Sequence, residues 1–413
     1  MKLPDGWKYI KLSDITTPLT EMAGDKKYET LSISAGIGFV NQAKKFGKEL
    51  SGKQYEKYTV LQRGDFSYNK GNSKKYPQGC IYQLTDRECA AVPNVFESFR
   101  FILGINDYYE QLFMSGFLNH QLASRINHGV RDDGLLNLTG KDFYDCFVPS
   151  PPLAEQQKIA EILCRQDKII SLKQKLLEQK LQQKKWLMQK LLEVPHTNAD
   201  CEEVFSLGGV VIDKSGWKRE KIETVAEISS GSTPRRDETE NFNGNILWLT
   251  SGELKQKYIS DTKEHISKKG AENCNLTIYK PGTVVIAIYG LEATGIRGTC
   301  SIINTECTIS QACMAFTNFK KVTNEYFYYW YLQNGQAIGS RYAQGTKQQN
   351  LSTDLMGNLS IEIPSFPEQK IIAQVLSTAD KEIALLKSSI EQEKQKKKSL
   401  AQLLLTGTVR VKI

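Results

Sequence analysis

Apolar side chains recur with a regular period near the C-terminal end of the chain. Between residues 368 and 405 there is no glycine or proline, and most residues are strong helix formers. Alternating steps of four and three residues connect Ile372, Leu376, Ala379, Ile383, Leu386, Ile390, Glu393, Lys397, Leu400 and Leu404. This spacing is that of a coiled-coil seam, so the pattern predicts one long helix with a narrow apolar stripe.

A second segment, residues 154–192, has the same composition and the same register. Its seam positions are Ile159, Leu163, Gln166, Ile170, Lys173, Leu177, Lys180, Lys184, Leu187 and Leu191. At 1.5 Å per residue, a segment of about 39 residues forms a rod of roughly 58 Å. Because so narrow a stripe gives a lone helix little stability in water, we expect the two helices to pack against each other. Two ordinary helices on separate cores are the alternative.

Charged residues interrupt both seams. Lys180, Lys184, Glu393 and Lys397 occupy seam positions, which indicates a place where water or another chain lies between the helices. The alternative is that their charged ends reach solvent along apolar stems. The spacing of Ser365 and Glu368 predicts a capping box at the second helix start, which the first helix, with Pro152 there, lacks.

The two helices belong to a duplication of most of the chain. An offset of 213 residues relates Glu155-Gln156 to Glu368-Gln369 and, farther along, Asp167 to Asp380. Upstream echoes in the same order pair Asn137-Leu138-Thr139 with Asn350-Leu351-Ser352, Ser124-Arg125 with Ser340-Arg341, Glu88-Cys89 with Glu306-Cys307, and Trp7-Lys8 with Trp217-Lys218. The predicted organisation is therefore globular domain, helix, globular domain, helix.

The remaining segments predict two mixed α/β domains. We expect strands over 64–69, 97–103, 245–250, 282–289 and 307–316, and helices over 107–126 and 324–342. The expected boundaries are a first domain at 1–150, its helix at 151–194, a linker at 195–216, a second domain at 217–363, and the second helix with a C-terminal tail at 364–413.

Composition narrows the class of protein. The chain has 413 residues and a formal net charge of +8, a modest basic excess that permits a polyanionic partner. No secretory signal or membrane-spanning run is evident, so a cytoplasmic location is expected. The nine cysteines form no C-x-x-C pair, and the four histidines are scattered, so neither a disulfide framework nor a metal site is expected.

Several loops combine basic, small polar and aromatic residues. They cover residues 67–79, 229–238 and 289–299, and an echoed Ser-Arg-x4-Gly-x-Arg/Lys pattern adds a fourth type. Lysine and arginine neutralise phosphates, while Arg, Asn and Gln read base edges, so this chemistry suits nucleic acid. The predicted DNA-binding residues are Lys70, Asn72, Lys74, Lys75, Tyr76, Arg125, Arg131, Ser232, Thr233, Arg235, Arg236, Tyr289, Arg297, Arg341, Lys347, Gln348 and Gln349. Ordinary solvated loops, or caps of the preceding helices, are the alternatives.

Two patterns resemble catalytic motifs. Ser150-Pro151-Pro152-Leu153 approaches the motif of amino-methyltransferases, but Leu153 lacks the ring that stacks on a flipped base. Asp237 with Glu253 and Lys255 follows the order of a metal-dependent nuclease triad, although acidic-x-Lys triplets arise by chance in so charged a chain. No P-loop occurs, so ATP hydrolysis is not expected of this chain.

Taken together, these residues resemble the specificity subunit of type I restriction-modification systems. Each domain is followed by a long helix that begins with Glu-Gln, as P-x-x-E-Q in the first copy, and ends near L-x-Q-x-L-L. The segments "SGSTPRRD" and "GNILWLTSGEL" are similar to a common start of that family's target-recognition domains. The resemblance covers nearly the whole chain. Ile371, where the first copy has Lys158, departs from the usual helix start.

The resemblance implies a fold and a function. Two target-recognition domains would sit on an antiparallel coiled coil, each reading one half of a bipartite, asymmetric sequence in double-stranded DNA, with the coiled coil setting the spacer. Two modification (methyltransferase) subunits and two restriction (motor and nuclease) subunits would be its partners, and S-adenosylmethionine, ATP and Mg would bind those partners. The expected coiled-coil and docking residues are Glu155, Gln156, Ile159, Leu163, Ile170, Leu177, Leu187, Leu191, Glu368, Gln369, Ile372, Leu376, Ile383, Leu386, Ile390, Leu400 and Leu404.

Three functions therefore compete. The leading one is a non-catalytic DNA-reading subunit of an assembled methyltransferase and ATP-dependent endonuclease. The second is a DNA-modifying enzyme with its own active site, and the third is a coiled-coil adaptor that does not bind DNA.

Overall fold

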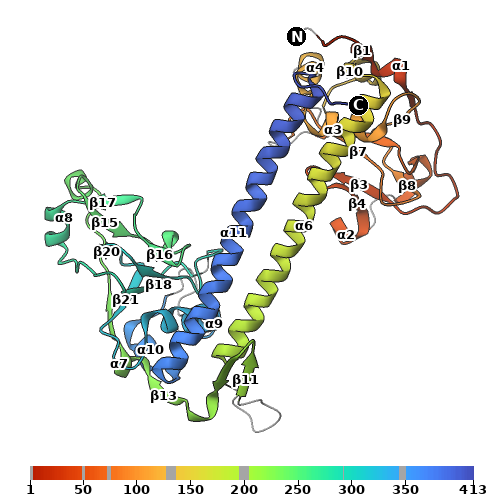
Figure 1. Ribbon diagram of the computed structural model, residues 1–413. Helices are drawn as coiled ribbons and strands as arrows, with labels where there is room; N and C mark the ends of the chain where they lie inside the picture. The colour runs from red at the N-terminus through yellow and green to blue at the C-terminus, as the bar shows by residue number, and fades with distance from the viewer. Residues whose placement is uncertain are drawn as a thin grey trace. The chain divides into compact units, whose positions relative to one another are not determined.

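The structure is a computed structural model that describes residues 3–48, 52–71, 76–126, 136–194, 204–291, 293–343 and 350–413. The chain forms two compact units, one made of Met1–Lys175 with Lys387–Ile413 and the other of Leu176–Leu386. Both boundaries fall inside long helices, so each unit combines one globular domain with part of each helix (Figure 1).

The first unit is built around a four-stranded antiparallel sheet in the order β2-β9-β6-β7. Its elements are β1 (Lys8–Lys11), α1 (Leu12–Ile15), β2 (Thr16–Pro18), β3 (Leu31–Ser34), β4 (Gly38–Asn41), α2 (Gln42–Phe46), η1 (Gly52–Lys57), β5 (Thr59–Gln62), β6 (Phe66–Asn69), β7 (Cys80–Gln83), β8 (Cys89–Val92), β9 (Glu97–Phe101), α3 (Asn106–Met114), α4 (Asn119–Arg125), α5 (Gly140–Tyr144), β10 (Phe147–Ser150) and the first part of α6 (Leu153–Leu192). Three two-stranded sheets complete the first unit, namely β3–β4, β5–β8 and β1–β10.

Aromatic side chains fill the core of this unit. Phe66 on β6 stacks on Phe99 of β9 with ring centroids 5.6 Å apart, and Phe101 stacks on Tyr109 of α3 at 4.3 Å. Such offset ring pairs add to the stabilisation that burial of their area provides. The core therefore fixes α3 against the sheet.

The helix predicted over 107–126 is divided in two. Residues 115–118 form a turn between α3 and α4, where Gly116 has a φ of 77°. This left-handed conformation is one that glycine adopts readily and that ends a helix. The counterpart predicted over 324–342 is one uninterrupted helix, α9.

The second unit has a similar but larger sheet, in the order β14-β21-β18-β19-β16. Its elements are β11 (Val204–Leu207), β12 (Val210–Asp213), η2 (Lys214–Gly216), β13 (Lys218–Lys221), α7 (Ile222–Val225), β14 (Glu227–Ser230), η3 (Thr239–Phe242), β15 (Ile246–Leu249), η4 (Ser251–Glu253), β16 (Tyr258–Ile259), β17 (Glu264–Ile266), α8 (Lys268–Asn273), β18 (Val284–Ala287), β19 (Cys300–Ile303), β20 (Cys307–Ile309), β21 (Cys313–Thr317), α9 (Asn324–Tyr342), α10 (Thr353–Asn358), β22 (Ser360–Ile363) and the first part of α11 (Phe366–Leu405). Strand pairing is mainly antiparallel, with parallel pairs at β15–β20 and β16–β19.

The succession of elements is the same in both halves. β1, α1 and β2 correspond to β13, α7 and β14, and the first strand of each set pairs with the strand that precedes a long helix. Lys8 lies opposite Ser150 and Lys218 opposite Ile363. Helices α6 and α11 each contain 40 residues and begin 213 positions apart. The duplication inferred from the sequence is thus present in the secondary structure.

No helix within the described part of the chain is long and apolar enough to cross a membrane. The described cysteines are all unpaired, and the described residues contain no group of three or more His, Cys, Asp or Glu side chains able to hold a metal ion.

Candidate nucleic-acid and partner interfaces

The start of α6 is fixed by Gln156. Its side-chain amide donates to the carbonyl oxygen of Pro151 at 2.8 Å, and its carbonyl oxygen accepts the backbone N–H of Ile105 at 2.9 Å. Ile105 is the N-cap of α3, and Gln156 is buried. One side chain therefore joins the long helix to the first helix of the globular domain.

Gln369 repeats this arrangement at the start of α11. Its side-chain amide donates to Pro364 O at 3.0 Å and to Lys321 O at 2.9 Å, while its carbonyl oxygen accepts the N–H of Thr323 at 2.7 Å. Thr323 is the N-cap of α9. We call Gln156 and Gln369 the glutamine clamps. They explain in physical terms why both helix starts carry glutamine at this position.

The neighbouring glutamates differ between the copies. Glu368 forms the predicted capping box, since its carboxylate accepts the N–H of Ser365 at 3.0 Å and the hydroxyl at 2.7 Å. Glu155 is buried, accepts the indole N–H of Trp7 at 3.2 Å, and is ion-paired with Arg410 from the segment after α11. In the first unit this glutamate thus joins three separate parts of the chain.

In the first unit, the charged seam positions bind the opposite helix. Glu393 accepts hydrogen bonds from Gln166 at 2.6 Å and from Lys173 at 2.7 Å, and Lys397 pairs with Asp167 at 2.7 Å. The hydrogen bonds from Lys173 and Gln166 hold the pKa of the Glu393 carboxyl below its usual value. The expectation that water or another chain intervenes at these positions was wrong here.

The second unit contains equivalent contacts. Lys180 pairs with Glu382 at 2.7 Å, and Lys184 pairs with Asp380 at 2.5 Å. The apolar seam residues of both helices lie around these pairs. Ile159, Leu163, Ile170, Leu187, Leu191, Ile372, Leu376, Ile383, Ile390 and Leu404 are buried, while Leu177, Leu386 and Leu400 are half-buried.

The predicted DNA-binding residues of the first domain are only partly described. Lys70 pairs with Glu97 at 3.2 Å, and Tyr76 is half-buried. The Arg125 guanidinium donates to Gln121 O and Asp145 O, so it caps α4, which was the alternative reading of this residue. Outside the described residues lie Asn72, Lys74, Lys75 and Arg131.

Arg235 and Arg236 are neighbours in one loop but differ in what they contact and in how exposed they are. Arg236 makes two 2.9 Å hydrogen bonds to the Glu264 carboxylate, and its guanidinium lies 5.0 Å from the ring centre of Phe242. Arg235 is 71% exposed and contacts Asp237 within its own loop. Behind them, Ser232 accepts the indole N–H of Trp248, and Thr233 is half-buried. Arg236 therefore fixes the loop, and Arg235 remains accessible.

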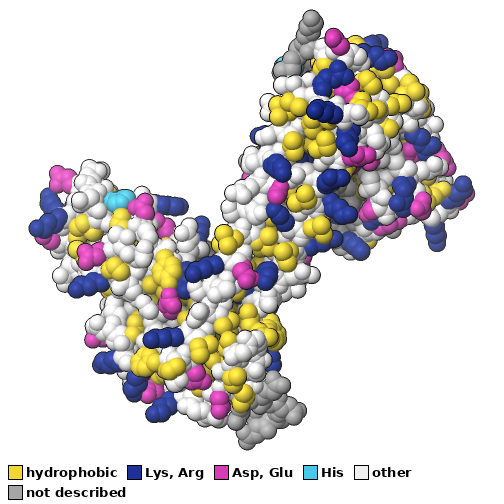
Figure 2. Space-filling model, viewed as in Figure 1, with side chains coloured by type: hydrophobic (Ala, Val, Ile, Leu, Met, Phe, Trp, Pro, Cys, Tyr) yellow, Lys and Arg dark blue, Asp and Glu magenta, His cyan; other side chains and the backbone are white. Residues whose placement is uncertain are grey.

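The third loop meets the C-terminal end of α9. Arg297 donates to the Ser340 hydroxyl at 3.2 Å. Arg341, the residue after Ser340, is exposed, and its guanidinium lies over the Tyr342 ring. Tyr289 packs against the core. Lys347, Gln348 and Gln349 lie outside the described residues. On the face drawn in Figure 2, basic and acidic side chains intermingle in each unit and form no field of one sign.

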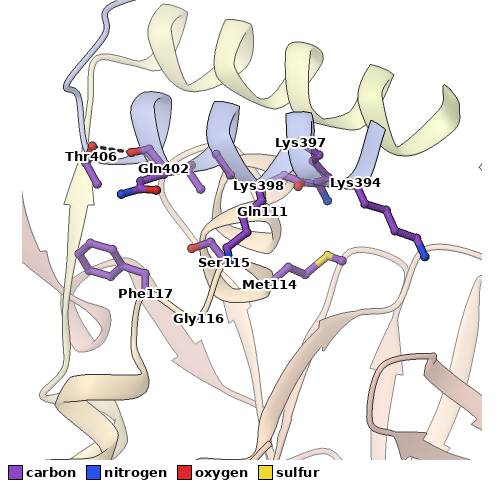
Figure 3. A pocket seen from close by; sticks show the side chains of 12 residues that line it. Gln111, Met114, Ser115, Gly116, Phe117, Lys394, Lys397, Lys398, Gln402 and Thr406 are labelled. Carbon is purple, nitrogen blue, oxygen red and sulfur yellow. Dashed lines mark hydrogen bonds between the residues drawn. The ribbon is translucent and has the colours of Figure 1, made fainter. Parts of the chain in front are cut away.

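A groove of about 550 Å³ lies in the first unit between the α3–α4 turn and α11. Met114 and Phe117 form one wall, and Lys394, Lys398 and Gln402 form the other (Figure 3). This groove was not predicted from the sequence. The one sequence pattern that could have indicated the groove is the i, i+4 spacing of Lys394 and Lys398. The turn that faces these lysines is 280 positions away in sequence, so the pattern does not reveal it.

A second groove, of about 600 Å³, lies in the second unit between the β11–β12 hairpin and the first turns of α11. Ile371 and Val375 line it, and both pack against the core together with Val210 of the hairpin. The departure at Ile371 is explained by this contact, because a lysine would bring a charge under the hairpin.

The residues that resemble catalytic motifs serve the fold. Pro151 accepts the amide of Gln156, so the Ser150–Leu153 segment ends a strand and begins a helix. Asp237 binds Arg235, whereas Glu253 caps η4 and accepts the N–H of Lys263 at 2.7 Å.

A titratable carboxyl lies on α3. Burial, with a contribution from Asp107, raises the pKa of Glu110 to about 7 from 4.5. A carboxyl with a raised pKa in the folded state contributes stability in full below pH 4.5, and this contribution is lost as the pH rises through about 7.

Glu110→Gln is therefore expected to flatten the decline of the unfolding free energy across this pH window. Urea denaturation at several pH values measures it, with the exposed Glu161→Gln as control. An unchanged slope in Glu110→Gln would contradict the assignment.

Known proteins resemble this chain both in sequence and in fold. Residues 214–395 match the family described as type I restriction modification DNA specificity domain. The type I restriction enzyme MjaVIII specificity subunit of Methanocaldococcus jannaschii is 27% identical over 302 residues, which cover 70% of this chain and 68% of that protein. The chain is therefore similar to type I specificity subunits over most of its length.

Other type I specificity subunits extend the comparison. The MjaIX specificity subunit of the same organism is 29% identical over 171 residues, 40% of this chain and 38% of that protein. Among solved structures, a chain of a type I R-M system studied for complex assembly and conformational transition has a TM-score of 0.61 at 17% identity, covering 99% of this chain and all of that chain. The S subunit from M. genitalium has a TM-score of 0.54 at 13% identity, covering 98% of both chains. At these identities the two structures establish the likeness of the fold.

Proposed function

We propose that the chain is the DNA sequence-specificity subunit of a type I restriction-modification complex. Each globular domain, residues 1–150 and 217–363, reads one half of a bipartite, asymmetric target. The observation that supports this most directly is the repeated glutamine clamp, because it attaches two different domains to two helices of equal length in the same way. Two different domains that are attached to their helices in the same way suit a target with two unlike halves.

In this proposal, α6 and α11 form an antiparallel coiled coil that sets the unread spacer. The direction is supported within each unit, because later residues of α6 pair with earlier residues of α11. In the first unit the pairs are Asp167–Lys397 and Lys173–Glu393, and in the second they are Lys180–Glu382 and Lys184–Asp380. Ion pairs at seam positions specify the register of a helix pair. A fixed register would keep the separation of the half-sites constant, as dimer geometry does in other DNA-binding proteins.

The partners follow from the same proposal. Two modification subunits would dock on the helices and domains, and two restriction subunits would complete the endonuclease. S-adenosylmethionine, ATP and Mg would bind those partners. The groove lined by Lys394 and Lys398 offers an apolar floor with basic edges to one such partner.

The contacts to DNA can be graded by what each side chain already binds. Arg235 and Arg341 are exposed and are the strongest proposed contacts. Lys70, Arg125 and Arg236 hold their loops through internal partners and would position those loops on the phosphate backbone. An enzyme with its own active site receives no support from Asp237 or Glu253, which have separate structural roles.

Footprinting tests the proposal. The chain assembled with its modification subunits is expected to protect two short segments of its target duplex, separated by an unprotected gap of constant length. The control is the same duplex with the two halves inverted relative to each other, which should show no protection. One continuous protected segment would contradict the proposal.

A further inference from the structure

Two aspartates of the long helices have no role in the function proposed so far. Asp167 on α6 and Asp380 on α11 are separated by the 213-residue offset of the duplication. Each is 11 positions after a glutamine clamp, which is about 16 Å along the helix. Their contacts are the same in kind in both units.

In the first unit, Asp167 connects three helices. Its carboxylate accepts the side-chain amide of Gln111 on α3 at 2.8 Å and the Lys397 ammonium of α11 at 2.7 Å. Gln111 is buried, with 4% of its surface exposed. Figure 3 shows Gln111 and Lys397 next to each other beside the groove. The globular domain and both long helices therefore meet at one carboxylate.

In the second unit, Asp380 connects the corresponding helices. Its carboxylate accepts the hydroxyl of Tyr329 on α9 at 2.8 Å and pairs with Lys184 of α6 at 2.5 Å. The Lys184 ammonium also lies 6.0 Å from the centre of the Tyr329 ring. We call Asp167 and Asp380, with their partners, the aspartate junctions.

The two junctions are reciprocal. Lys184 and Lys397 are also separated by 213 positions, so each lysine pairs with the aspartate of the other copy. The donors from the globular domains, Gln111 and Tyr329, differ in chemistry. Each is nevertheless the sixth residue after the N-cap of its helix. Two divergent domains thus make the same attachment with different side chains.

Each globular helix shares an apolar core with its long helix, and polar contacts connect the two helices at two places. The glutamine clamp holds the N-cap of α3 or α9, and the aspartate junction holds the same helix six residues later, about 9 Å along its axis. Because hydrogen bonds are directional, two of them spaced along one helix define its angle to the long helix more closely than the shared apolar core alone. The other ion pairs between α6 and α11, such as Lys180–Glu382, involve no residue of a globular domain.

We propose that Asp167 and Asp380 are positioning residues for DNA recognition. They fix the angle at which each recognition domain is held on the helix pair, and so the spacer length that the assembled complex accepts. This inference rests on the proposed function, because it assumes that the domains read two half-sites.

Tyr329→Phe tests the second junction with the smallest change. It removes the hydroxyl that donates to Asp380 and accepts a 3.4 Å hydrogen bond from Lys257, and it leaves the ring and the Lys184–Asp380 pair in place. The full chain, assembled with its modification subunits, would be assayed for methylation of duplexes that carry its own target with the native spacer or a spacer one base pair shorter or longer. Loss of a hydrogen bond to a carboxylate is expected to reduce the preference for the native spacer about tenfold.

Two tyrosines of the same helix supply matched controls. Tyr326→Phe removes a 2.8 Å hydrogen bond to Glu362 O within the domain, so it reproduces a loss of stability without touching the junction. Tyr331→Phe removes a buried hydroxyl that has no hydrogen-bond partner in the described structure. Both variants are expected to keep the spacer preference of the wild type.

The possible outcomes are distinct. A spacer preference in Tyr329→Phe equal to that in Tyr326→Phe overturns the inference, and relaxed preference in all three variants does so too, since it would reflect stability alone. Lys184→Met, which removes the lysine from the same junction, should relax the spacer preference as Tyr329→Phe does. A wild-type complex that methylates a target without two halves would contradict the proposed function itself, whatever the variants do.

Discussion

Gln369→Leu is expected to lower the free energy of unfolding of the second unit by about 2–4 kcal/mol. Leucine occupies similar space but cannot bind the N–H of Thr323 or the carbonyl oxygens of Pro364 and Lys321. Each polar group that remains buried without a partner costs about 1–3 kcal/mol. The expected decrease in the free energy of unfolding is therefore larger than the decrease caused by removing a single surface hydrogen bond.

Urea denaturation followed by tryptophan fluorescence would measure this change. Gln392→Leu, at an exposed position of the same helix, is the matched control and should change stability by no more than about 0.5 kcal/mol. Gln156→Leu should produce the corresponding loss in the first unit. Equal stability of Gln369→Leu and Gln392→Leu would show that the clamp is not a stabilising contact.

The second large loss of stability is expected for Arg410→Met. Glu155 is 1% exposed, and its charge is balanced by the Arg410 guanidinium, which also donates to Asp5 O at 2.8 Å. Among the described residues, Arg410→Met leaves the buried carboxylate with the Trp7 indole as its one side-chain partner. The Arg410 side chain is 44% exposed, but the Glu155 carboxylate that it would leave behind is buried, so its charge would be neither solvated nor compensated.

A double variant distinguishes charge from packing. Arg410→Met combined with Glu155→Gln should recover much of the thermal stability that Arg410→Met alone loses, since no buried charge is left unpaired. Arg219→Met serves as a surface control, because that arginine is 63% exposed and 3.8 Å from Glu362. A double variant that melts below Arg410→Met would argue that the ion pair is not the origin of the effect.

The long helices and the duplication could be predicted because their signals are local or periodic. Heptad spacing and the absence of glycine and proline gave both helices to within two residues of their observed starts. The echo also identified Gln156 and Gln369, but not what they bind. Their partners, the N–H groups of Ile105 and Thr323, are backbone atoms about 50 positions away, and no side-chain pattern marks them.

For the candidate DNA contacts, the sequence could indicate the loops but not which basic residues in them are available to bind DNA. A basic residue in a polar loop appears the same in sequence whether it binds DNA or a distant carboxylate. Arg236 binds Glu264, 28 positions away, and Lys70 binds Glu97, 27 positions away. Similarly, the charged seam residues find partners on the other helix, and only the register of the two helices reveals those pairs.

The composition of the first unit has a consequence for the order of folding during synthesis. The second unit is one continuous segment, Leu176–Leu386, whereas the first requires residues from both chain ends, with Gly407 packed against Pro4 and Trp7. The ribosome therefore supplies every residue of the second unit before it supplies the last 27 residues of the first. The first unit therefore cannot complete its fold until residues 387–413 have been translated, while the second unit can complete its fold earlier.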